Sequence, residues 1–447
     1  MKHSLSLLLG VLTLATCGCA SPARAAPTAR VTCTIELDRA LLPAEAVQRT
    51  VMKIALRTPE LASPAERPPV NLAVVLDRSG SMGGDKIERA KEAAIEALHR
   101  LGSRDLFSLV IYDHEVETVV PPQSAANTEW IEGRIRKIQS RGNTALFAGV
   151  SQGAAEIRKN IENRKYVPRV LLLSDGQANV GPSTPTDLGR LGTALMKEGI
   201  AVTTVGVGAD YNEDLMTRLS QASDGNAYFA ASSSELTRIF AAELGGVLKV
   251  AARQVVLEVT CTGGVKPLRI IGREGRIRGE TVEITLNQLY GGQEKFVLVE
   301  VEIPAARAEE VKDIAVASCR YADAITQSED KASTRATVRF TRDDKAVAGS
   351  VNVAVQKDIA INAAAIASDR AISMNDAGDN RLAAALLKKE SDRLSKVASE
   401  YNLPEVAQQA VELEAKSKVL ESRALNANER KTMRTDSYQQ RNQQLEK

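Results

Sequence analysis

The stretch from residue 71 to residue 84, NLAVVLDRSGSMGG, decides the fold of this 447-residue chain. Its apolar run shows no polar alternation, which is typical of a strand buried on both faces of a parallel sheet. The run ends at Asp77, and two hydroxyl side chains follow at alternate positions, Ser79 and Ser81. The glycines around them allow the backbone to turn sharply. The stretch therefore predicts a central strand with three oxygen donors just beyond its carboxyl end.

The region around this stretch, residues 70–248, alternates buried strand-like runs with amphipathic helical patterns. This alternation predicts an α/β domain with a doubly wound, mostly parallel sheet that helices cover on both faces. Ligands of such sheets bind at the carboxyl ends of the strands. Two more oxygen donors occupy that edge in the predicted topology: Thr144, just before a helix, and Asp175, at the end of the run VLLLSD.

These five side chains, Asp77, Ser79, Ser81, Thr144 and Asp175, are all hard oxygen donors. Carboxylates and hydroxyls suit Mg²⁺, Mn²⁺ or Ca²⁺ better than zinc. We expect a divalent metal ion here, and Mg²⁺ first among the three. A structural Asp–Ser turn without metal is the competing interpretation of the same residues.

The pattern D-x-S-x-S at 77–81, with Thr144 and Asp175 in the correct order, resembles the von Willebrand factor type A (VWA) domain and its metal-ion-dependent adhesion site (MIDAS). The whole chain is similar to bacterial exported VWA proteins of the inter-α-trypsin-inhibitor heavy chain type. The resemblance implies a Rossmann-like fold. It also implies that an Asp or Glu of a protein partner completes the coordination of the ion.

The loops on the same edge of the sheet supply candidates for the surface that meets the partner. We expect that surface to include Asp113, His114, Gln177, Asn179 and Asp210.

The flanking regions have other patterns. Residues 26–69 hold strand-like segments and a Pro-rich linker, and residues 249–345 alternate with the period of two that is typical of an antiparallel β-sandwich. The α/β domain is thus inserted in this sandwich or followed by it. Residues 350–422 predict a helical hairpin or bundle. Residues 423–447 are polar in composition, which is compatible with a disordered tail.

The first 25 residues resemble a secretory signal peptide: basic residues, a short apolar run and an A-x-A motif at 23–25. Two imperfect lipobox-like motifs end at Cys17 and Cys19, so cleavage after the A-x-A motif and lipid attachment both remain open. We expect an exported protein, periplasmic or secreted, whose membrane contact is limited to such an N-terminal lipid anchor. An exported chain could oxidise two of Cys33, Cys261 and Cys319, or bury all three as small apolar residues.

Composition excludes several classes of function. With 58 basic and 56 acidic residues and 3% aromatics, nothing favours nucleic-acid binding.

The run Gly149–Gly153 matches the G-x-S-x-G nucleophile elbow of hydrolases, but Ser151 falls within a predicted helix and no histidine follows His114. We therefore expect no enzyme.

The leading hypothesis is an extracytoplasmic, metal-dependent protein-binding module for adhesion or scaffolding. The alternative is a structural or envelope-assembly protein in which the metal only stabilises the fold and the helical tail binds the partner.

Overall fold

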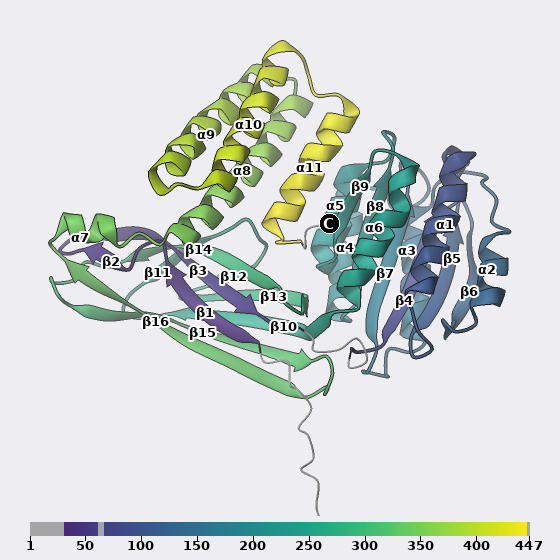
Figure 1. Cartoon of the computed structure of the whole chain (residues 1–447), viewed down its shortest axis with the longest axis horizontal. Helices are drawn as coiled ribbons and strands as arrows, with labels where there is room; N and C mark the ends of the chain where they lie inside the picture. The colour runs from purple at the N-terminus through teal and green to yellow at the C-terminus, as the bar shows by residue number, and fades with distance from the viewer. Residues whose placement is uncertain (1–30, 61–66, 445–447) are drawn as a thin grey trace, which may run out of the picture.

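The computed structural model describes residues 31–60 and 67–444, and the predicted signal peptide lies outside them. Three parts are visible in Figure 1: an α/β domain, a β-sandwich and a group of C-terminal helices. This mixed architecture confirms the predicted fold class.

The α/β domain is built on a six-stranded sheet in the order β6-β5-β4-β7-β8-β9. Its neighbouring strands are parallel, except that β6 runs antiparallel to β5. The strands are β4 (Val70–Asp77), β5 (Leu106–Tyr112), β6 (Val116–Ser124), β7 (Val167–Ser174), β8 (Ala201–Val207) and β9 (Ala227–Ala230). The stretch that opened the sequence analysis forms β4, which lies at the centre of the sheet and is buried along its whole length.

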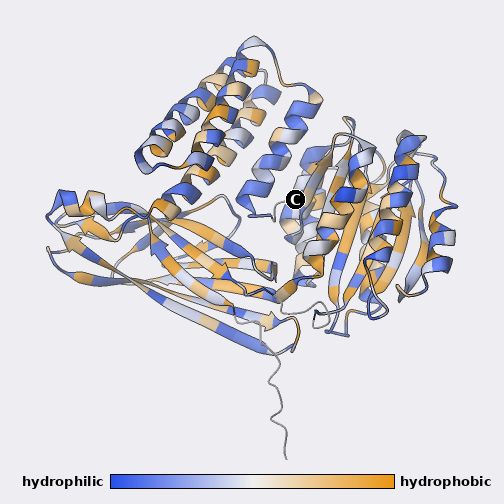
Figure 2. Ribbon diagram, viewed as in Figure 1, coloured by the Kyte–Doolittle hydropathy of each residue, from blue (hydrophilic) through white to orange (hydrophobic). Residues whose placement is uncertain are grey.

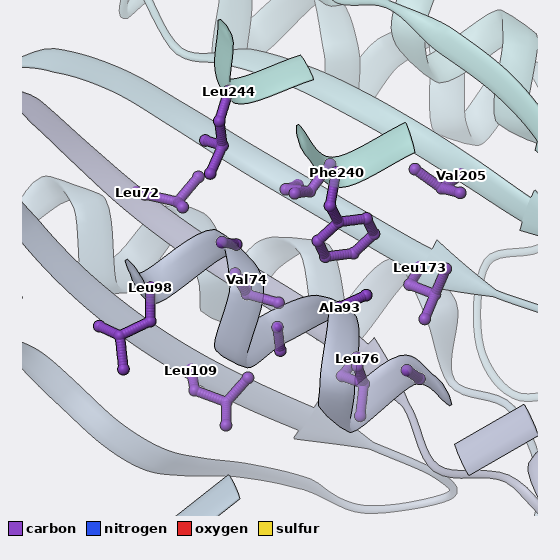
Figure 3. Close-up of a cluster of buried hydrophobic side chains, with 14 of the residues drawn as sticks. Leu72, Val74, Leu76, Ala93, Leu98, Leu109, Leu173, Val205, Phe240 and Leu244 are labelled. Atoms are coloured by element: carbon purple, nitrogen blue, oxygen red, sulfur yellow. The ribbon is translucent and has the colours of Figure 1, made fainter. Parts of the chain in front are cut away.

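Helices cover both faces of this sheet. One face carries α1 (Asp85–His99), α2 (Thr128–Ile135) and α6 (Leu236–Val247), and the other carries α3 (Leu146–Arg158), α4 (Pro185–Lys197) and α5 (Glu213–Ser223). Leu72 and Leu76 of β4 belong to the same buried core as Leu98 of α1 and Phe240 of α6 (Figure 3). The strands between the helices are mostly hydrophobic (Figure 2). Burial of each such side chain contributes about 1.5–3 kcal/mol, which holds the strand ends in fixed positions.

The sandwich packs a four-stranded sheet, β1-β3-β14-β11, against a six-stranded one, β12-β13-β10-β15-β16-β2. Strand β3 pairs with β14 from Arg57–Glu294 to Gln48–Ile303, so one sheet uses chain from both sides of the α/β domain. The α/β domain is therefore an insertion in the sandwich. The strands are β1 (Thr32–Leu37), β2 (Leu41–Pro43), β3 (Gln48–Arg57), β10 (Val250–Cys261), β11 (Lys266–Ile271), β12 (Arg276–Arg278), β13 (Thr281–Tyr290), β14 (Glu294–Ile303), β15 (Val311–Asp323) and β16 (Glu329–Thr341).

The C-terminal part consists of α7 (Asp344–Gly349), α8 (Val353–Asp376), α9 (Asn380–Tyr401), α10 (Pro404–Ser422) and α11 (Ala427–Arg441). Helix α11 corrects the expectation of a disordered tail. A capping box between Asn426 and Glu429 starts it, and Met433 and Tyr438 are buried. The polar composition of α11 did not predict this helix, because its charged side chains pair with charges on α5 and α8 instead of facing water. Within the described ranges, no helix is long and apolar enough to cross a membrane.

Helix α11 also connects the helical part to the α/β domain, and it lies between the two in Figure 1. The Tyr438 hydroxyl donates to the Gly225 carbonyl at 2.6 Å, just before edge strand β9. Gln439 Nε2 donates to the Ala227 carbonyl at 2.8 Å. The last helix therefore covers one edge of the sheet, where an unpaired strand would otherwise be exposed.

Candidate metal centre at the carboxyl edge of the sheet

Asp77, the last residue of β4, is completely buried at the carboxyl edge of the sheet. The Ser174 hydroxyl, at the end of neighbouring β7, donates to Asp77 Oδ2 at 2.6 Å. The backbone N–H of Ser79 donates to Oδ1 at 2.8 Å. Two bonds therefore fix the orientation of this carboxylate before any ligand binds.

The turn after β4 brings the two serines to the same place. The Ser79 and Ser81 hydroxyl oxygens lie 3.1 Å apart, and Ser81 Oγ donates to Asp175 Oδ1 at 2.8 Å. The side chain of Met82 is fully buried and anchors the turn in the core. The oxygen donors that follow β4 and the donor that follows β7 thus form one connected group.

Thr144 reaches this group from the loop before α3. The Gly80 N–H donates to the Gly142 carbonyl at 3.0 Å, which ties that loop to the turn after β4. A Cβ atom added at Gly176 would lie 3.0 Å from Thr144 Oγ1 and 3.5 Å from Ser81 Oγ. The structure therefore brings all five predicted donors to one corner of the domain, where a Cβ atom on residue 176 would make a tight contact with Thr144.

The chemistry of this corner fits a hard divalent cation. It offers two buried carboxylates and three hydroxyls, and neither a thiolate nor an imidazole belongs to the set. Burial raises the pKa of Asp77 to about 6, and the nearby charge of Asp175 adds to the effect, whereas hydrogen bonds from Ser174 and Ser79 oppose it. A bound cation would favour the charged form of both carboxylates. Ser81 is exposed, so the corner opens to solvent.

Asp113 does not belong to the surface that we predicted for the partner. It is fully buried, 2.9 Å from Arg78 Nε and 2.8 Å from Arg141 Nε. Burial alone would raise the pKa of Asp113. Hydrogen bonds from the Glu115 backbone and Arg141, together with the charges of Arg78 and Arg141, lower this pKa instead. The position of Asp113 directly after a strand predicted an exposed side chain. Its burial left no sign in the sequence, because the two arginines that cover it come from other loops.

Asp113, His114 and Glu115 also place three potential ligand atoms within 4.8 Å of one another. The two guanidinium groups already neutralise Asp113, so this group is a poor cation site. It instead fixes Arg78 and Arg141 beside the turn that carries Ser79.

The other four predicted surface residues are accessible at this edge. His114 is about half exposed and packs over Gly142, where an added Cβ would lie 2.3 Å from His114 Nδ1. Gly142 also has a positive φ of 71°, which favours glycine. Gln177, Asn179 and Asp210 are exposed. Asn179 Oδ1 also accepts the Thr144 N–H at 2.9 Å, so this residue holds the threonine loop in place.

Two residues of the site were missed in the sequence. Ser174 precedes Asp175 directly, and its hydrogen bond to Asp77 depends on the pairing of β4 with β7. Lys86, in the first turn of α1, places Nζ 2.5 Å from Asp175 Oδ2. A lysine nine positions after Asp77 gives no signal alone, because only the fold brings α1 beside the end of β7.

The hydrolase-like run is structural, as expected. Ser151 lies within α3, and its hydroxyl donates to the Phe147 carbonyl one turn earlier at 2.8 Å. Added Cβ atoms at Gly149 and Gly153 would lie 2.6 Å from the Tyr112 ring and 2.4 Å from Val75. These glycines therefore let α3 approach the sheet closely.

A doubly wound sheet with a group of hard oxygen donors at its carboxyl edge defines the class of this domain. Residues 71–242 match the family model of the von Willebrand factor type A domain, and the chain therefore contains a domain of this family. VWA domains commonly mediate metal-dependent protein interactions, bind a divalent metal at the MIDAS, and are typically not enzymes.

Two relatives show how far the sequence likeness reaches. The uncharacterized protein sll0103 of Synechocystis sp. is 32% identical over 174 residues, which are 39% of this chain and 40% of that protein. Human inter-alpha-trypsin inhibitor heavy chain H3 is 32% identical over 124 residues, 26% of this chain and 14% of that protein. The match thus spans less than half of these relatives.

A solved structure, the von Willebrand factor type A protein from Catenulispora acidiphila, extends the likeness of fold beyond the VWA domain. It superposes with a TM-score of 0.68 and 17% identity over 88% of this chain and 97% of the other. The arrangement of VWA domain, sandwich and helices therefore occurs in another protein.

Proposed function

We propose that this chain is an extracytoplasmic protein-binding module in which a divalent cation, Mg²⁺ before Mn²⁺ or Ca²⁺, coordinates an acidic residue of a protein partner. One observation carries the proposal: Asp77, Ser79, Ser81, Thr144 and Asp175 converge at a corner of the VWA domain that opens to solvent.

The chemistry of the donors explains why a partner would be acidic. Three of the five donors are neutral hydroxyls, which bind a cation without cancelling its charge. A carboxylate that arrives from outside would fill a coordination position that the five donors leave open. Adhesion and scaffolding both use an interaction of this kind.

The place of action rests on the N-terminal sequence. Residues 1–25 have the pattern of an export signal, and either lipid attachment or release after the A-x-A motif at 23–25 would leave the VWA domain outside the cytoplasm.

The decisive experiment is retention of envelope proteins by purified residues 26–447 in millimolar Mg²⁺ and in chelator. Asp77→Asn removes the negative charge of one donor, and Ser81→Ala removes one hydroxyl donor. Ser81 is exposed, so the second variant leaves the core intact. Asp313→Ala, an exposed carboxylate on β15, serves as the matched control. We expect a partner that wild type and the control retain only with Mg²⁺ and that both site variants lose.

The alternative, in which the metal only stabilises the fold, predicts a different result. All variants would then retain the partner equally, with and without chelator. Asp77→Asn would lower only the melting temperature in Mg²⁺, since a ligand that binds the folded state stabilises it by mass action. That outcome would contradict the proposed function.

A further inference from the structure

Lys86 is the one basic side chain that an ion pair joins directly to the five donors, as far as the described residues extend. Its Nζ lies 2.5 Å from Asp175 Oδ2, while Ser81 Oγ donates to the other oxygen of that carboxylate. Asp175 is fully buried and the Lys86 side chain is 30% exposed. The ammonium therefore approaches the carboxylate from the solvent side, at the edge of the candidate metal centre.

The acidic neighbours of Lys86 on α1 pair with other residues. Asp85 accepts the Ser233 hydroxyl at 2.7 Å and lies 3.5 Å from Arg89. Glu88 lies 2.7 Å from Lys91. Lys86 thus forms a pair with a buried carboxylate instead of an exposed pair along its own helix.

We propose that Lys86 is an internal cation that sets the charge of the metal centre and so weakens its hold on the divalent ion. This inference rests on the proposed function, because it requires a divalent ion at the five donors. Any such ion would share the carboxylate of Asp175 with the ammonium. Two positive charges held beside one carboxylate repel each other, and they do so more strongly in partly buried surroundings than in water.

The same charge would favour the acidic partner. Asp77 and Asp175 together with the Lys86 ammonium carry a net charge of minus one, so a divalent ion leaves the centre with a charge of plus one. Without Lys86 the carboxylates would neutralise the ion. Lys86 therefore lowers the affinity of the centre for the metal ion and strengthens its attraction for an incoming carboxylate. The centre binds its ion most firmly when the partner is present.

The test is Mn²⁺ binding to residues 26–447, followed by the electron paramagnetic resonance signal of free Mn²⁺. Lys86→Gln removes the charge and Lys86→Arg keeps it. Lys197→Gln, an exposed lysine at the far end of α4, is the control for net charge. We expect Lys86→Gln to bind Mn²⁺ about tenfold more tightly, and the other two variants to bind like wild type.

The sign of the change decides between two roles of Lys86. Unchanged or weaker binding by Lys86→Gln, with native circular dichroism, would overturn the inference and reduce Lys86 to a residue that positions Asp175. If neither wild type nor Lys86→Gln binds Mn²⁺, the proposed metal centre itself is wrong. Binding by Lys86→Gln alone would support the internal cation.

Discussion

Lys431 of α11 donates to Glu213, the first residue of α5, at 2.7 Å, although 218 positions separate them in the chain. Each side chain is only 6% exposed. Arg430 pairs with Glu213 as well and reaches Asp214 at 2.7 Å. The last helix of the chain is therefore joined to the VWA domain by buried charges.

We expect Lys431→Met to lower the free energy of unfolding by about 3 kcal/mol, because it leaves part of the Glu213 charge buried without its partner. Glu213→Gln should cost a similar amount. The double variant should cost less than the sum, with a coupling of about 1–3 kcal/mol in urea unfolding. Lys389→Met, an exposed change on α9, should stay within about 0.5 kcal/mol. Additive costs would show that the contact is not energetically coupled.

A second buried charge joins the VWA domain to the sandwich. Arg169 of β7 is fully buried, and its Nη2 donates to Gln288 Oε1 on β13 at 2.6 Å. Its Nη1 donates to Thr203 Oγ1 at 3.1 Å and lies 3.6 Å from Glu243. Removing the guanidinium would leave Glu243 buried without a counter-charge.

We therefore expect Arg169→Met to cost about 3–5 kcal/mol in urea unfolding. The paired variant Arg169→Met with Glu243→Gln should recover part of the loss, since both charges are then absent. A cost below about 1 kcal/mol for Arg169→Met would contradict a buried, paired charge at this boundary.

Gly176→Ala tests the space between Thr144 and Ser81. The added Cβ would lie 3.0 Å from Thr144 Oγ1, closer than ordinary contact, and would move that hydroxyl out of position. We expect a metal affinity about tenfold weaker by calorimetric titration, with a change in unfolding free energy of no more than about 2 kcal/mol.

Gly133→Ala in α2 is the matched control, because its Cβ meets nothing within 4 Å. It should leave metal affinity unchanged and raise stability by up to about 1 kcal/mol. Equal metal affinity in wild type and Gly176→Ala would mean that Thr144 does not help to hold the ion.

The three cysteines outside the predicted signal peptide are buried free thiols, which agrees with the second of the two expectations for them. Burial raises the pKa of Cys33 and of Cys261 to about 11. Burial, with a contribution from Cys33, raises that of Cys319 to about 12.

A raised thiol pKa means less of the reactive thiolate, so at pH 8 these cysteines should react with Ellman's reagent far more slowly than a free thiol. All three should react promptly in urea. Fast reaction of one thiol in the native protein would show that its burial is incomplete or transient.

The sequence alone determined the α/β class, the central position of β4 and the five oxygen donors. The reason is local: a parallel strand buried on both faces requires an unbroken apolar run, and the donors directly follow such strands or precede a helix. The alternation typical of the sandwich was equally visible.

Only the tertiary structure decided which charges lie beside which. The tail at 427–441 reads as polar, yet it folds because Arg430 and Lys431 find carboxylates on α5. Asp113 reads as a surface residue, yet Arg78 and Arg141 cover it. Lys86 and Ser174 join the metal centre only once α1, β4 and β7 are assembled. Periodicity records which side of an element is buried, whereas the pairing of charges depends on distances between segments that sequence patterns do not encode.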